Sequence, residues 1–101
     1  MAKLKVIWSD RAKAQLKSIH DYIKYKKKSP QGASNVRKDI LKASRDIVFE
    51  KQYQQDEIEP EYRRIVVRHY KLLYKEKDGK ILILRLFDTY QSTERQLKDD
   101  Y

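Results

Sequence analysis

The sequence predicts an α+β domain in which an N-terminal strand and a pair of helices precede a three-stranded antiparallel meander. Two observations lead to this order. Apolar residues recur at helical spacing over two segments, residues 10–26 and 30–48, and strand-like runs with a hairpin turn follow between residues 62 and 87. Residues 1–101 show no repeat, linker or low-complexity segment, so we expect one domain.

The first three elements are predicted from apolar spacing and capping residues. Leu4–Trp8 is a short apolar run, and Ser9 after it is a suitable N-cap for the first helix. Pro30 suits the first turn of a second helix, which should end near Val48 or Phe49. Because only a few residues join the two helices, they should form an antiparallel hairpin and place their apolar stripes on one face of the sheet.

The remaining elements are predicted from a polar segment and three strand-like runs. Residues 50–61 are polar and are expected to form a loop. Strands are predicted at about 62–67, 69–76 and 80–87. Asp78-Gly79 should form the last hairpin turn, because glycine accepts a positive φ angle and aspartate tolerates the preceding position. The expected order is therefore β-α-α-β-β-β.

Simple alternation assigns the side chains of the last strand to two faces. Leu82, Leu84 and Leu86 share one side, which we expect to pack on the helices. Arg85 then lies on the opposite side, within an apolar run. Because an uncompensated buried guanidinium is costly to desolvate, Arg85 should open onto a groove or pair with a carboxylate.

Charge and composition narrow the classes of function. The chain has 24 Lys+Arg against 15 Asp+Glu, a net charge of +9, which favours a polyanion or an acidic protein as partner. It has no cysteine, and His20 and His69 alone do not suggest a metal centre, so we expect no cofactor and metal-free chemistry in any catalysis. We expect a cytoplasmic protein, because no apolar run approaches the ~18 residues of a membrane span and no signal-peptide core is present.

Cationic and phenolic residues gather on the predicted strands and suggest a surface for an anionic partner. His69 could move a proton near neutral pH, although a lone histidine is more often a surface residue. Tyr90 could hydrogen-bond a phosphate, stack on a base or pack at the sheet edge. The remaining candidates for nucleic-acid binding are the cations Arg63, Arg64 and Lys71.

The order of elements and several runs of residues resemble the RelE/ParE toxin superfamily. The runs are Val6–Ser9 before the first helix, Tyr62-Arg63-Arg64, Tyr70–Tyr74 and Ile83–Thr89. The resemblance covers nearly the whole chain. It implies the toxin of a type II toxin–antitoxin (plasmid stabilisation) pair, with a cognate antitoxin whose largely acidic or amphipathic segment wraps the toxin.

The resemblance implies two possible mechanisms. RelE-like members cleave mRNA in the ribosomal A site without metal, whereas ParE-like members poison DNA gyrase. We take the ribosome-dependent mRNA endonuclease as the leading hypothesis; in it, Arg68 and Arg85 bind the scissile phosphate and His69 or Tyr90 acts as acid or base. Many relatives carry arginine where this chain has Tyr90. The alternatives are a gyrase inhibitor that uses the helical hairpin and the tail, and a basic RNA-binding or interaction module without activity.

Overall fold

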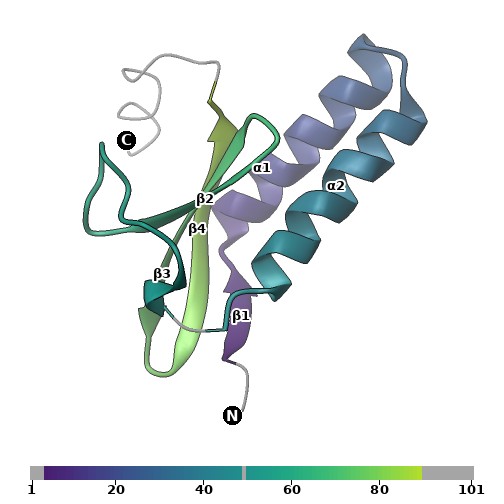
Figure 1. The fold of residues 1–101 in the computed structure, drawn as a ribbon. Coiled ribbons are helices and arrows are strands. Elements are labelled where there is room, and N and C mark those ends of the chain that lie inside the picture. The colour runs from purple at the N-terminus through teal and green to yellow at the C-terminus, as the bar shows by residue number, and fades with distance from the viewer. Residues whose placement is uncertain (1–3, 49, 90–101) are drawn as a thin grey trace.

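A computed structural model describes residues 4–48 and 50–89 and confirms the predicted α+β order. The helical hairpin lies on one face of a four-stranded sheet (Figure 1). The strands follow the order β1-β4-β3-β2, in which β1 is parallel to β4 and the other neighbours are antiparallel. The elements are β1 (Lys5–Trp8), α1 (Asp10–Asp21), α2 (Pro30–Arg45), β2 (Arg63–Val67), β3 (Tyr70–Lys77) and β4 (Lys80–Asp88), with a short π-helix η1 (Tyr22–Lys26) and a 3₁₀ turn η2 (Glu50–Gln52).

Both predicted helix caps are confirmed. The hydroxyl of Ser9 accepts a hydrogen bond from the backbone N–H of Ala12 (3.0 Å) and donates one to the carbonyl of Leu84 (2.9 Å). Ser29 caps α2 by accepting from the N–H of Gly32 (3.1 Å), and Pro30 occupies the first turn. Ser9 therefore starts α1 and also fixes its start against β4.

The second helix ends earlier than predicted. α2 stops at Arg45, whereas the sequence predicted an end near Val48 or Phe49. After it the chain turns inward, so that Ile47 is fully buried. The side chain of Gln52 accepts from the N–H of Val48 (2.7 Å) and donates to the carbonyl of Asp46 (3.1 Å). These side-chain hydrogen bonds replace the backbone bonds that a longer helix would make. The helical spacing of apolar residues in the sequence thus extends beyond the residue at which the helix ends.

A β-bulge in β4 makes the predicted assignment of its faces wrong. Leu73 pairs with Arg85 and the next residue, Tyr74, pairs with Ile83, so Leu84 is an extra residue in the ladder. Such an insertion reverses the alternation of the strand. The face of the sheet that packs on the helices therefore carries Ile81, Ile83 and Leu86, which are all in the core cluster, and not the set Leu82, Leu84 and Leu86.

The core lies between this face of the sheet and the two helices. α1 contributes Ala12 and Leu16, α2 contributes Ala33, Val36 and Ile40, and the sheet contributes Ile65, Leu72, Tyr74, Ile81, Ile83 and Leu86, all buried. Ser44, which interrupts the apolar row of α2, is buried, and its hydroxyl is satisfied because it accepts a hydrogen bond from the indole N–H of Trp8 (3.2 Å) and donates one to the carbonyl of Leu41 (2.8 Å). Within residues 4–48 and 50–89, no helix is long and apolar enough to cross a membrane.

Candidate functional site

The side of the sheet that faces away from α1 and α2, here called the outer face, is covered by the loop of residues 53–62. Asp56 organises this loop, because its Oδ2 accepts from the N–H groups of Ile58 (3.1 Å) and Glu59 (2.8 Å). The N–H of Asp56 bonds in turn to the carbonyl of Tyr62 (2.9 Å), which closes the loop. The polar segment that was predicted as a loop is therefore an ordered cover, and it brings two carboxylates to the sheet.

The two carboxylates of this loop form ion pairs with cations of the outer face. The Lys71 ammonium lies 2.7 Å from Oδ1 of Asp56, whose side chain is 0% exposed. The Arg85 guanidinium pairs with Glu59, with side chains 4% and 6% exposed. The Phe87 ring lies 5.5 Å from Nζ of Lys71 and 5.8 Å from Cζ of Arg85. Of the two arrangements expected for Arg85, the structure contains the carboxylate pair.

The two arginines at the start of β2 also contact the 53–62 loop. Arg63 donates from Nη1 to the carbonyl of Tyr53 (2.8 Å). Nη1 of Arg64 lies 3.2 Å from Oε1 of Glu57. These candidates for nucleic-acid binding thus hold the cover in place along one edge of the sheet.

Arg68 and His69 form the two-residue turn between β2 and β3. Arg68 has a φ angle of +58°, and its guanidinium contacts Oδ2 of Asp39 on α2 through Nη2 (2.8 Å) and Nε (3.0 Å). The His69 ring stacks on Tyr70, with centroids 4.1 Å apart, and its Nε2 lies 3.7 Å from Oδ2 of Asp88. The turn is therefore tied to a helix by Arg68 and lies against β4 through His69.

Burial perturbs one phenol beside this turn. The Tyr70 side chain belongs to the core, and burial raises the pKa of its hydroxyl above the ordinary value. The charge of Asp88 adds to this rise in pKa, whereas Arg68 opposes it. Tyr70 thus stays protonated through the neutral range and carries no charge at the end of the sheet.

The structure separates the candidate catalytic residues. Arg68 reaches a helix on the core side of the sheet, whereas Arg85 lies on the outer face opposite Leu73. His69 lies beside Arg68 in the turn, and Tyr90 is outside the described residues. The three described candidates contact three different carboxylates, those of Asp39, Asp88 and Glu59. In residues 4–48 and 50–89, no group of three or more histidine and acidic side chains could hold a metal ion.

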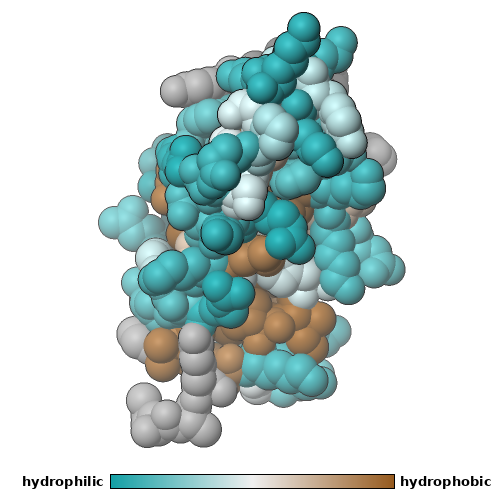
Figure 2. Space-filling model, turned by 90° about the vertical axis from the view of Figure 1, so that its right-hand side faces the viewer, coloured by the Kyte–Doolittle hydropathy of each residue, from teal (hydrophilic) through white to brown (hydrophobic). Residues whose placement is uncertain are grey.

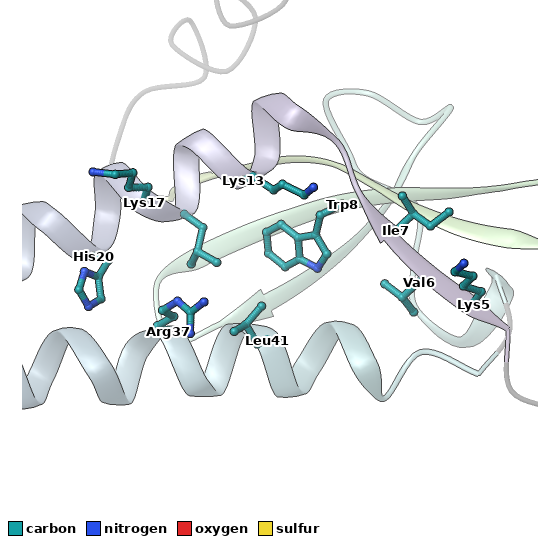
Figure 3. Close-up of a pocket in the computed structure, with 10 residues that line it drawn as sticks. Lys5, Val6, Ile7, Trp8, Lys13, Lys17, His20, Arg37 and Leu41 are labelled. Atoms are coloured by element: carbon teal, nitrogen blue, oxygen red, sulfur yellow. The ribbon is translucent and has the colours of Figure 1, made fainter.

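A groove of about 790 Å³ lies between β1 and the two helices (Figure 3), and the sequence did not predict it. Trp8 points into the space between the helices, opposite Leu41 of α2. The lining residues are Lys5, Val6, Ile7, Trp8, Lys13, Leu16, Lys17, His20, Arg37 and Leu41. On the sequence alone these cations were scattered along three elements, and only the topology brings them together.

The groove combines apolar side chains with cations. Four of its lining residues are lysine or arginine and none is acidic. Lys17 donates to Asp21 (2.6 Å), and this hydrogen bond lowers the pKa of the Asp21 carboxyl and raises that of Lys17. β1 is the edge strand of the sheet, so one side of its backbone faces the groove region without a neighbouring strand of the described chain.

The face that carries the helices has a hydrophobic region and a hydrophilic region in the space-filling view. In Figure 2, hydrophobic residues gather in the lower half of this face, and hydrophilic residues cover its upper half. The upper half includes the far end of the hairpin, which extends beyond the sheet in Figure 1. The molecule thus offers two different exposed surfaces, a mixed apolar and cationic groove and a hydrophilic hairpin end.

Comparisons with known proteins agree with the fold. A family model described as the ParE toxin of the type II toxin–antitoxin system parDE matches residues 6–92. A solved structure described as the chromosomal ParDE toxin–antitoxin system from P. aeruginosa is similar, with 20% sequence identity and a TM-score of 0.70. The similarity covers 84% of this chain and 95% of that chain. Among curated proteins, none matches.

Proposed function

Because the chain belongs to the ParE toxin family of type II toxin–antitoxin systems, we propose that it inhibits DNA gyrase through a protein–protein contact. Members of this family typically inhibit gyrase and do not cleave mRNA as RelE toxins do. The family match therefore favours the gyrase alternative over the mRNA endonuclease hypothesis. In this proposal no side chain of the chain acts as a catalyst.

The observation that carries the proposal is the pairing of the outer-face cations. RNA cleavage needs cationic groups directed at the charge that develops on the phosphate. Arg85 and Lys71 are instead buried against Glu59 and Asp56 of the same chain. Separating one such buried pair costs about 3–5 kcal/mol. An RNA phosphate would have to compete with these internal carboxylates, which supports a non-nucleolytic toxin.

We further propose that the groove beside β1 binds the cognate antitoxin. The relative's description, a ParDE toxin–antitoxin system, implies such a partner. An amphipathic acidic segment would place apolar side chains on Trp8 and Leu41 and carboxylates near Lys5, Lys13 and Arg37. The free edge of β1 could also add a strand of the partner through backbone hydrogen bonds.

A supercoiling assay with purified gyrase and the full-length chain tests the proposal. We expect loss of supercoiling at saturating toxin and its recovery when the antitoxin is added. Primer extension on translated mRNA, from cells that express the toxin, is the parallel measurement. Unaffected supercoiling together with new cleavage sites in mRNA would contradict gyrase inhibition and favour the mRNA endonuclease hypothesis. Normal growth without the antitoxin would instead favour the inactive module.

The groove is tested separately by charge reversal. The variant Lys5→Glu/Arg37→Glu should bind the antitoxin more weakly, mainly through a slower association rate that depends on salt. The matched control Lys26→Glu/Lys27→Glu carries the same change in charge at the far end of the helical hairpin, and neither residue lines the groove. Equal loss of affinity in both variants would mean that only net charge matters.

A further inference from the structure

The far end of the helical hairpin carries two exposed tyrosines among lysines, and neither the groove nor the outer face includes them. We call residues 22–28 the hairpin tip. Tyr22 is 55% and Tyr25 65% exposed, the largest exposed fractions among the big apolar or aromatic side chains of the described chain. Large aromatic side chains with a polar end are common at binding surfaces. The two exposed tyrosines are therefore a candidate binding surface.

The local backbone explains why both rings face solvent. Tyr22–Lys26 of the tip form a π-helix, which the hydrogen bond from the N–H of Lys27 to the carbonyl of Tyr22 (3.3 Å) closes. The N–H of Ser29 bonds to the carbonyl of Ile23 (3.1 Å) after the turn. Ile23 alone of this segment is buried and anchors it to the core. Single π-helical turns are frequent at functional sites. The segment is thus held at one residue and displays the others.

The charge of the hairpin tip differs from that of the outer face. From Tyr22 to Lys38 the sequence has six lysine or arginine residues and no acidic residue. Within the part of the chain that the structure describes, no carboxylate pairs with Lys24 or Lys27. Their ammonium groups lie instead 5.2 Å and 5.9 Å from the rings of Tyr25 and Tyr22. Each ring thus has a cation beside it that is available to an anion.

We infer that the hairpin tip binds single-stranded nucleic acid, with bases stacked on the two tyrosine rings and phosphates near the lysines. Aromatic platforms flanked by cations are the general means of holding single strands without reading sequence. Duplex readout fits less well, because two adjacent helices, each about 10 Å wide, are too broad for a major groove of about 12 Å. This activity goes beyond gyrase inhibition and does not need gyrase.

Fluorescence anisotropy with labelled oligothymidylate, oligouridylate and a DNA duplex tests the inference on the full-length chain. We expect Tyr22→Ala/Tyr25→Ala to weaken single-strand binding by about tenfold or more, and Tyr22→Phe/Tyr25→Phe to retain it. Lys24→Gln/Lys27→Gln should reduce the slope of log affinity against log salt by about 1.4, since each phosphate contact contributes roughly 0.7. The two single-stranded probes distinguish DNA from RNA as the source of the ligand.

The control variant Lys77→Gln/Lys80→Gln removes the same charge at the β3–β4 turn, at the opposite end of the molecule from the hairpin tip (Figure 1). Equal losses in the tip and control variants would overturn the inference, as would duplex binding that ignores the tyrosines. Tip variants that lose gyrase inhibition but bind oligonucleotides normally would identify a protein-docking surface instead. Circular dichroism on every variant separates loss of binding from loss of fold. If the protein does not inhibit gyrase in the supercoiling assay, the oligonucleotide-binding result still stands, because it does not depend on gyrase.

Discussion

Breaking the buried pair between Arg85 and Glu59 gives the sharpest test of the outer face. In Glu59→Leu the guanidinium stays buried, with a side chain only 4% exposed, but loses its carboxylate. Removing one partner of a buried pair costs about 3–5 kcal/mol. Small domains have only about 5–15 kcal/mol of stability in total. At about 3 kcal/mol the Tm should fall by roughly 12–24 °C, since each kcal/mol corresponds to about 4–8 °C in a domain of this size.

The assay is a double-mutant cycle measured by urea unfolding. Glu59→Leu and Arg85→Met should each lower the unfolding midpoint at an unchanged m-value. The double variant replaces the pair by apolar side chains of similar size, so its free energy of unfolding should return close to that of the natural chain. Its toxicity on expression without antitoxin should also be preserved, because we assign Arg85 a structural role.

Two results would contradict this reasoning. Single variants that lose less than about 1 kcal/mol would place the pair in the class of exposed ion pairs. A double variant that is as stable as the natural chain but no longer toxic would give Arg85 a direct role in activity. That second outcome would revive the nuclease reading of the outer face.

Three smaller effects follow from local geometry. Ser9→Ala removes the cap of α1 and the bond to the Leu84 carbonyl, and should cost about 1–2 kcal/mol in urea unfolding, whereas Ser9→Thr should cost less. Gly79→Ala should cost about 1–2 kcal/mol because φ is +74° there, although no atom lies within 4 Å of an added Cβ; a loss no larger than that of Gly79→Asn would argue against backbone strain. Lys17→Met should raise the lowered pKa of Asp21 in an NMR titration. The stabilisation from that carboxylate is present above its unfolded pKa and is lost as pH falls through its lower folded pKa, so this substitution should reduce stability at neutral pH and make no difference through Asp21 below the folded pKa; an unchanged pKa would rule out Lys17 as the cause.

The element order was predictable from the sequence because each boundary has a local signal. Ser9 and Pro30 begin the helices, and Asp78-Gly79 turns the last hairpin with positive φ angles of +53° and +74°. These signals depend on neighbours in the chain. The bulge at Leu84 does not, because it arises where Ser9 binds the Leu84 carbonyl and Gln15 accepts from the N–H of Leu86 (2.8 Å), residues far away in sequence. Alternation alone therefore placed the leucines of β4 wrongly.

The candidate site was predictable only in part. The sequence predicted that Arg85 either opens onto a groove or pairs with a carboxylate, and the structure contains the pair with Glu59. The sequence could not identify that partner, because residues 50–61 have neither helical nor strand periodicity and gave no sign of packing on the sheet. The sequence offered only two hints of the pair, a lone arginine within an apolar strand and acidic residues in the loop segment. The groove depends on three elements that meet only in the folded chain, and no local pattern marks it.

The parallel pairing of β1 with β4 governs when this protein can fold. Among the described residues, β1 is the first element and its neighbour in the sheet, β4, is the last, and the Ser9–Leu84 bond spans 75 positions. Closing so long a loop delays the sheet relative to the local helical hairpin. A nascent chain that stops before residue 80 lacks the partner of both β1 and β3. The groove that β1 lines, where we propose that the antitoxin binds, is therefore completed only after β4 has been synthesised.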